Sequence, residues 1–295
     1  MFLQFEKWHG CSNDFLVIKT DPANEEMIRN ALVRQAKRIC DRHTGVGADG
    51  ILLLAFSHEN LTDFQLTIIN SDGSIAANCG NGLRCAAGYV NKNAQEFQQF
   101  INFNVNDRIF TSSIIKNTPE APIVQINMGQ AVMGPEVSWH EKSSAAEALK
   151  NTLGPFYVFE IGNPHIVFET SPDERIKIFG PQLQSSILED GINVHFAESC
   201  EITKEDQKLA QKNLGSEISE LYKMIIWERG AGLTLACGSG ACAVASKSIF
   251  DGLYQPGDWI AVDMPGGRVY VMHEDANELF LAGAANFVYK GEVEV

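Results

Sequence analysis

Residues 227–246, WERGAGLTLACGSGACAVAS, constrain the fold most, because a cysteine stands where a glycine-rich loop turns into a helix. Glycines precede and follow Cys237, and small, helix-compatible residues then continue to Phe250. The free backbone N–H groups and the positive dipole end of a helix start favour a thiolate, and they can also hold a carboxylate. Cys237 is therefore the first candidate for chemistry.

The same pattern occurs once more, at residues 70–90, NSDGSIAANCGNGLRCAAGYV. Here Cys79 is followed by Gly-Asn-Gly and another run of small residues. One such helix start in each half of the chain predicts two related domains that face each other across a cleft. Two facing thiols could form a disulfide, bind a metal, or move a proton from one side of a carbon atom to the other.

The bulk composition limits the function classes. At 295 residues the chain suits two domains of about 150 residues, each with its own core. The formal net charge of −14 argues against nucleic-acid or anionic-membrane partners, which require a basic surface. Residues 1–10 show no secretory signal, and seven cysteines without one indicate free thiols in a reducing cytoplasm.

Hydrophobic periodicity predicts an α+β fold in which strand pairs surround one buried helix in each half. We expect helices over residues 24–42 and after each of the two cysteines, and a polar helix-prone segment at 143–153. The charged residues 199–220 indicate a solvated helical excursion. Expected strands are 2–5, 15–19, 51–56, 64–69, 97–103, 108–115, 123–128, 157–161, 166–169, 222–227, 278–282 and 286–289.

A possible nucleotide fingerprint, Gly45 to Gly50 (GVGADG), is rejected. It matches GxGxxG in letters, but a helix is expected before it and a strand after it, the reverse of the required order. A glycine-rich turn is the better interpretation.

The cysteine spacing weighs against two of the thiol chemistries. Zinc sites need closely spaced cysteines, C-x2-4-C, and thioredoxin-type redox sites need C-x-x-C; neither pattern is present. We therefore expect no metal. Buried small residues are the simplest interpretation of the other five cysteines, with Cys85 and Cys242 on the inner sides of their helices.

Seven motifs, in order and over nearly the whole chain, resemble the diaminopimelate epimerase family. They are HGCSNDF (9–15), GVGADG (45–50), NSDGSIAANCGNGLRC (70–85), GNPH (162–165), GINV (191–194), ERGAGLTLACGSGAC (228–242) and MPGG (264–267). The resemblance implies two pseudo-symmetric domains, each a mostly antiparallel sheet wrapped around a central helix, with the active site in the interdomain cleft. The implied boundaries are 1–120, joined by the C-terminal strand at about 284–295, and 121–283.

The resemblance also implies an activity. Members interconvert LL-2,6-diaminopimelate and meso-diaminopimelate without pyridoxal phosphate or another cofactor, in lysine and peptidoglycan precursor biosynthesis, as cytoplasmic homodimers. One thiolate removes the α-proton while the other thiol protonates the opposite face, because a single base would return the proton to its own side. By similarity Cys79 is the donor and Cys237 the acceptor in the written direction.

Further roles follow from matching positions. His165 and Glu228 match polar residues that assist catalysis. Substrate-binding positions by resemblance are Asn13, Asn70, Gly80, Asn81, Asn163, Asn193, Glu228, Arg229, Gly238 and Ser239. The N–H groups at the two helix starts would stabilise the negative charge that develops on the α-carboxylate.

Three departures from the family pattern and two alternative functions remain. The charged segment 199–220 makes the span from Asn193 to Glu228 longer than is usual in the family. Ser12 replaces a usual glycine and Leu233 a frequent glutamate, and neither removes a group assigned to chemistry. A cofactor-independent racemase of another amino acid is one alternative to the epimerase. A non-catalytic amino-acid-binding protein or thiol redox sensor is the other.

Overall fold

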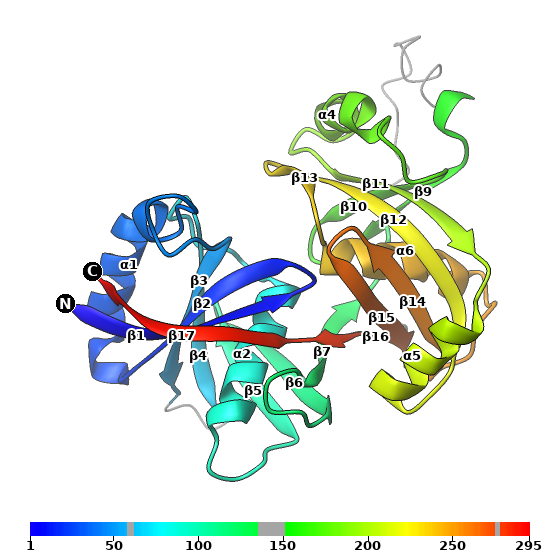
Figure 1. Cartoon of the computed structure of the whole chain (residues 1–295). Coiled ribbons are helices and arrows are strands. Elements are labelled where there is room, and N and C mark those ends of the chain that lie inside the picture. The colour runs from blue at the N-terminus through cyan, green and yellow to red at the C-terminus, as the bar shows by residue number, and fades with distance from the viewer. Residues whose placement is uncertain (58–61, 135–150, 275–277) are drawn as a thin grey trace. The chain divides into compact units, whose positions relative to one another are not determined.

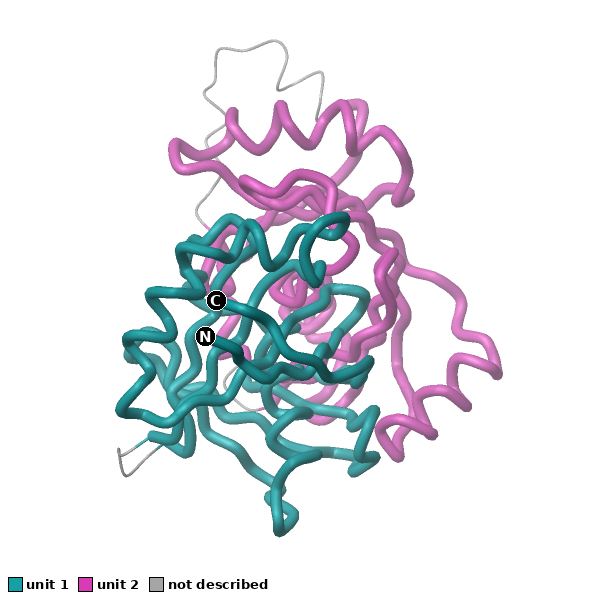
Figure 2. The backbone as a smooth tube through the Cα atoms, turned by 60° about the vertical axis from the view of Figure 1, so that its left-hand side comes forward, with its two compact units in different colours: residues 1–127, 282–295 teal, residues 128–281 magenta. Residues whose placement is uncertain are grey.

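A computed structural model describes residues 1–57, 62–134, 151–274 and 278–295. The chain folds into two compact units (Figures 1 and 2): residues 1–127 with 282–295, and residues 128–281. The sequence-based boundary before residue 121 lies in the turn that precedes β7, whereas this division falls inside β7 itself. That the expected segments are separately folding domains stays a prediction.

Unit 1 contains one mixed sheet with a helix on each face. Its strands pair in the order β17-β1-β2-β3-β4-β5-β6-β7, antiparallel except for the β2–β3 and β4–β5 pairs. The elements are β1 (Phe2–Gly10), β2 (Asn13–Thr20), η1 (Pro22–Asn24), α1 (Glu25–Ile39), β3 (Gly50–Phe56), β4 (Phe64–Asn70), α2 (Gly80–Asn93), β5 (Phe100–Val105), β6 (Arg108–Lys116), β7 (Ile123–Gln130) and β17 (Asn286–Glu294).

Unit 2 repeats this order. The pairs that correspond are β8–β9, β9–β10, β10–β11, β11–β12, β12–β14 and β14–β15, of which β10–β11 and β12–β14 are parallel. The short strand β13 pairs antiparallel with the end of β12. The elements are β8 (Val132–Met133), β9 (Phe156–Glu160), β10 (Pro164–Glu169), α4 (Ile176–Ser186), β11 (Asn193–Cys200), α5 (Lys204–Leu214), β12 (Ile218–Glu228), β13 (Gly232–Thr234), α6 (Gly238–Phe250), β14 (Trp259–Met264), β15 (Gly267–His273) and β16 (Glu278–Ala284). Two repeats of an α+β unit confirm the expected fold class.

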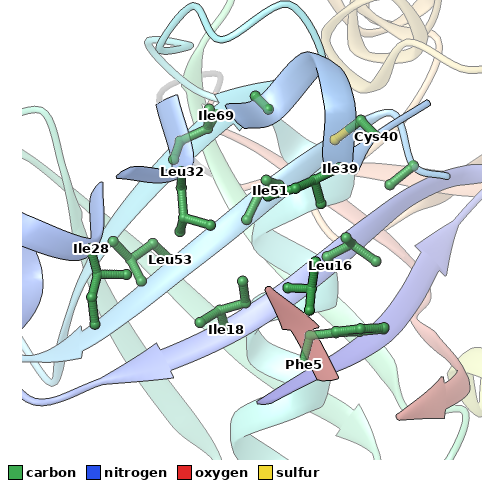
Figure 3. Close-up of a cluster of buried hydrophobic side chains, with 13 residues drawn as sticks. Phe5, Leu16, Ile18, Ile28, Leu32, Ile39, Cys40, Ile51, Leu53 and Ile69 are labelled. Atoms are coloured by element: carbon green, nitrogen blue, oxygen red, sulfur yellow. The ribbon is translucent and has the colours of Figure 1, made fainter. Parts of the chain in front are cut away.

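The central strand of each unit is buried on both faces, as strands covered by helices on both sides must be. In β3, Ile51 and Leu53 pack into the cluster under α1 that Figure 3 shows, so the alternate Leu52 points to the other face. In β11, Val194 and Phe196 belong to the cluster under α4. The intervening residue, His195, therefore faces α6.

The two central helices, α2 and α6, are the helices expected after the cysteines. Small side chains let the strands of each unit close around them: α2 contacts β1, β2, β3, β6 and β17, and α6 contacts β9, β10, β11, β12, β14 and β15. Cys85 and Cys242 are fully buried on these helices, as predicted. The structure holds the seven cysteines as thiols and not as disulfides. Cys200 was expected to be buried, but it stands at the exposed end of β11 and is only half-buried.

The structure also corrects two expectations about helices. Residues 199–220 are not one helical excursion: β11 runs to Cys200, α5 covers only Lys204–Leu214, and β12 starts at Ile218. Helix α4 was not predicted from the sequence. Gly180 and Pro181 lie in the middle of this helix, and both residues argue against a helix in a sequence pattern. Residues 143–150 of the expected polar helix lie outside the described residues.

Candidate active site

In unit 1, Cys79 is the N-cap residue of α2. Its backbone is extended, and its Sγ accepts a hydrogen bond from the N–H of Gly82 at 3.4 Å. Gly80 and Asn81 are the first two helical residues, so their N–H groups have no carbonyl partner within the helix. The half-buried thiol therefore lies at the positive end of the helix dipole.

A buried arginine lies behind this helix start. Arg84 is fully buried, and its Nη2 donates to Oδ1 of Asn81 at 2.6 Å and lies 3.8 Å from Sγ of Cys11. Burial raises the pKa of the Cys11 thiol and Arg84 lowers it. Sequence reasoning missed Arg84, although it stands inside the second cysteine motif.

The β1–β2 hairpin brings Asn13 to the same region. Cys11 and Ser12 form its two-residue turn, both with positive φ, and Asn13 pairs with Gly10 across it. A Cβ atom on Gly10 would lie 3.1 Å from Nη2 of Arg84, so the end of the hairpin packs directly on the start of α2. Asn70 lies at the end of β4, where its Nδ2 donates to Oγ of Ser74 at 2.9 Å.

In unit 2, Cys237 is the N-cap residue of α6 in the same geometry. Its Sγ accepts from the N–H of Gly240 at 3.4 Å and lies 3.6 Å from Oγ of Ser239. Its own N–H is directed at Sδ of Met264. Gly238 and Ser239 therefore present the free N–H groups of this second helix start.

Glu228, the last residue of β12, interacts with this thiol. Burial raises the pKa of the Glu228 carboxyl above its usual value, against hydrogen bonds from Thr234 and Cys237 that lower it. A carboxylate that accepts a hydrogen bond from a thiol can take the proton when the thiolate forms. Glu228 and Cys237 together can act as an acid–base pair.

Asn163 and His165 belong to a chain of hydrogen bonds that ends at a second histidine. Nε2 of His165 lies 2.8 Å from Oδ1 of Asn163, and its Nδ1 lies 2.9 Å from Nε2 of His195. Both imidazoles are fully buried. Burial, then His195 and Arg229, holds the pKa of His165 well below its usual value, and burial lowers the pKa of His195 to about 3.

Asn193 connects the start of β11 to the residues around it. Its Nδ2 donates to the carbonyl oxygen of Pro164 at 2.9 Å, and its Oδ1 accepts from the N–H of Arg229 at 3.0 Å. The guanidinium of Arg229 donates to the carbonyl oxygen of Asp190 at 2.9 Å and remains exposed. Asn193 therefore orders the backbone from which Arg229 extends.

A sequence profile described as "Diaminopimelate epimerase" matches residues 5–134 and 157–288, which include every candidate residue above. The chain belongs to the diaminopimelate epimerase family. The two thiol-capped helix starts lie one in each matched segment.

Individual relatives agree with this family. The chain is 32% identical over 303 residues to the diaminopimelate epimerase of Caldanaerobacter subterraneus subsp. tengcongensis, covering 99% of this chain and 100% of the relative. It is 31% identical over 297 residues to that of Carboxydothermus hydrogenoformans, covering 98% and 99%.

Solved structures share the fold beyond the family. A PhzF-family phenazine biosynthesis protein from Bacillus anthracis matches with a TM-score of 0.71 at 12% identity, covering 100% of both chains. A hydroxyproline epimerase from Agrobacterium vitis matches with a TM-score of 0.66 at 12% identity, covering 99% of this chain and 91% of that one. At this identity the likeness concerns the fold alone.

Two further findings concern metals and membranes. Within residues 1–57, 62–134, 151–274 and 278–295, no three or more His, Cys, Asp or Glu side chains are grouped to hold a metal ion. No helix in those ranges is long and apolar enough to cross a bilayer.

Proposed function

We propose that this chain is a diaminopimelate epimerase that interconverts the LL and meso isomers by two thiols, without pyridoxal phosphate. The observation that carries the proposal is the repeated thiol geometry. Cys79 and Cys237 each cap a helix and accept a hydrogen bond from the N–H three residues on, at 3.4 Å in both cases. Family membership and the relatives' names give the substrate.

The chemistry assigns one proton step to each thiol. The Cys237 thiolate takes the α-proton, and the Cys79 thiol gives its own proton to the opposite face of the same carbon. The reverse reaction exchanges the two roles. Glu228 takes the thiol proton of Cys237 before the first step, and its raised pKa makes the carboxylate a better proton acceptor.

An unactivated amino acid is a weak carbon acid, so the charge that develops on its α-carboxylate must be stabilised. The N–H groups of Gly80, Asn81, Gly238 and Ser239 are the proposed donors, because helix starts present unpaired N–H groups and a positive dipole end. Losing one such donor typically costs about 3 kcal/mol of transition-state stabilisation. Asn13, Asn70, Asn163 and Arg229 are the proposed contacts to the remaining amino and carboxylate groups.

The mechanism needs both thiols at one α-carbon, and the two thiols belong to different units. It therefore requires an active site in a cleft between the units, and this cleft stays a prediction. We also propose a homodimer in the cytoplasm, in lysine and peptidoglycan precursor biosynthesis. Seven cysteines held as thiols and not as disulfides suit a reducing compartment. Sedimentation equilibrium of the purified chain tests the dimer, and a monomer across the micromolar range would contradict it.

Proton NMR of LL-2,6-diaminopimelate in deuterium oxide, with reduced protein and no added cofactor, tests the function. We expect loss of the α-proton signal and appearance of the meso isomer. Cys79→Ser and Cys237→Ser should each abolish epimerisation while the fold is kept. Cys200→Ser, at a half-buried thiol outside the site, is the matched control and should leave turnover unchanged.

No exchange with diaminopimelate, but exchange of another amino acid such as lysine or histidine, would replace the substrate and keep the mechanism. Undiminished turnover in both active-site serine variants would overturn the two-thiol mechanism.

A further inference from the structure

The internal repeat allows a residue-by-residue comparison of the two units. In the parallel pair β2–β3, Phe15 lies opposite Gly50, and in β10–β11, His165 lies opposite Asn193. Two residues further along the second strand are Leu52 and His195. Phe15 and Leu52 of unit 1 therefore correspond to His165 and His195 of unit 2.

The helix contacts support this correspondence. A Cβ atom on Gly82, three residues after Cys79, would lie 3.2 Å from Cδ2 of Leu52. A Cβ atom on Gly240, three residues after Cys237, would lie 2.6 Å from Cε1 of His195. Leu52 and His195 thus fill the same place, directly beneath the first turn of the thiol-bearing helix.

Packing alone does not explain the two histidines. In unit 1, Phe15 and Leu52 fill these positions with buried apolar side chains. In unit 2, both imidazoles are fully buried, which is costly for polar rings unless they are hydrogen-bonded. Their hydrogen bonds lead away from the core to Asn163, which is partly exposed.

The hydrogen-bond chain has a direction. With Oδ1 of Asn163 as the acceptor, Nε2 of His165 is the donor and carries the proton. In a neutral ring Nδ1 of His165 must then accept from Nε2–H of His195. Nδ1 of His195 is left with a lone pair that has no partner among the described residues. The reverse direction would bury an unpaired N–H there, which folded proteins avoid more strictly.

The corresponding asparagine of unit 1, Asn13, has no histidine two residues after it. Asn13 precedes Phe15 by the same two positions that separate Asn163 from His165. Its Oδ1 is buried without a hydrogen-bond partner in the described part of the chain. Phe15, which takes the place of His165, has no ring nitrogen to bond the amide, whereas His165 contacts Oδ1 of Asn163.

We propose that His195 is a positioning residue that fixes the proton of His165 on Nε2. The Nε2–H group holds the Asn163 oxygen inward, so the Asn163 NH2 group faces a substrate carboxylate. The inference rests on the proposed function for the identity of the substrate. His165 then acts through Asn163, because both of its ring nitrogens are occupied and neither is exposed. Neutral rings agree with the lowered pKa of each histidine.

The first test is nitrogen-15 NMR of the histidine-labelled full chain without substrate. We expect the His165 ring to be neutral, protonated at Nε2 and bare at Nδ1, and His195 to be protonated at Nε2. A proton on Nδ1 of His165 in the wild-type chain would overturn the proposal, whatever the variants show.

The second test compares His195→Phe, which keeps a ring beneath Gly240 but has no donor, with His195→Gln, which keeps an N–H donor. We expect His195→Phe to raise KM for LL-2,6-diaminopimelate about tenfold, the worth of one hydrogen bond, and to change kcat less than about twofold. His195→Gln should recover most of the loss. Equal KM values in wild type and His195→Phe, or no recovery by His195→Gln, would contradict the role.

A control and a double mutant separate positioning from packing. His273→Phe makes the same change at another buried histidine of unit 2. The ring nitrogens of His273 have no hydrogen bonds among the described residues. This control should leave KM and the His165 spectrum unchanged. In an Asn163→Ala background, His195→Phe should add no further KM effect. If the wild type does not epimerise diaminopimelate, the function fails, and the substrate-free spectrum still decides the role of His195.

Discussion

At the scale of single residues, the departures from the family pattern at Ser12 and Leu233 have different consequences. Leu233 lies in β13 with an exposed side chain, so it occupies the glutamate position without entering the core. Ser12 has φ 64 in the two-residue turn of the β1–β2 hairpin. This left-handed conformation strains residues with a Cβ atom, and glycine avoids that strain.

We expect Ser12→Gly to raise the free energy of unfolding by roughly 0.5 to 1 kcal/mol, because relief of the left-handed strain exceeds the added entropy of the unfolded chain. Urea titration measures it. Ser216→Gly, at an exposed bend without positive φ, is the control and should be neutral or destabilising. A loss of stability in Ser12→Gly would show that the hydroxyl matters more than the strain.

Glu228→Gln should separate stability from activity. The folded pKa of Glu228 is raised, so the folded chain binds more protons than the unfolded chain above the usual carboxyl pKa, and stability falls as pH rises through this window. Glutamine does not titrate, so this loss is absent in the variant. The free energy of unfolding of the variant, relative to that of the wild type, should therefore be higher at pH 7 than at pH 4. Its kcat should fall about 10² to 10⁴-fold, because the proton acceptor beside Cys237 is gone.

Denaturant titrations at both pH values and steady-state kinetics check this prediction. Glu217→Gln, at an exposed position, controls for the loss of one surface charge. An unchanged kcat would remove Glu228 from the acid–base chemistry.

At the scale of elements, the helix that carries Cys79 is positioned by close contacts rather than by long apolar side chains. Helix α2 crosses β1 at Gly88, where a Cβ atom would lie 2.8 Å from Cζ3 of the fully buried Trp8 and 3.0 Å from Cβ of Ala285. At its last turn, Lys92 bonds Glu6 at 3.1 Å. These contacts fix the position of α2 against β1, and with it the position of Cys79 at the start of the helix.

We expect Gly88→Ala to destabilise the fold by about 1 to 3 kcal/mol, because overpacking against Trp8 outweighs the higher helix propensity of alanine. Thermal and urea unfolding measure the change. Asn30→Ala, at an exposed position of α1, isolates propensity and should be neutral or stabilising. A more stable Gly88→Ala variant would show that Trp8 can move aside.

At the scale of the whole molecule, the two proposed catalytic thiols lie in different units of the same chain: Cys79 in unit 1 and Cys237 in unit 2. Two segments join the units, since the chain passes between them once inside β7 and once inside β16. Both termini lie in unit 1, where the terminal ammonium of Met1 donates to the carbonyl oxygen of Val295 at 2.8 Å. The proposed mechanism therefore needs one intact chain for each active site.

We expect a mixture of Cys79→Ser and Cys237→Ser chains, unfolded and refolded together, to stay inactive, because neither chain carries both thiols. The NMR exchange assay measures this, and refolded wild type gives the reference rate. Recovery toward a quarter of that rate would mean that the two thiols of one site come from different chains.

The sequence alone determined the features that depend on neighbouring residues. Glycine-rich helix starts place Cys79 and Cys237 at N-caps, small residues make α2 and α6 central helices, and apolar runs specify most strands. Periodicity and capping act within a few residues, so these signals are visible in the chain.

Only the tertiary structure decided which distant residues meet. The β10–β11 register puts His165 beside His195, and the hairpin packing puts Cys11 beside Arg84. Helix α4 forms despite Gly180 and Pro181, because its apolar face covers Val194 and Phe196. Strand register and burial are properties of the folded core, and no local pattern in the chain encodes these pairings.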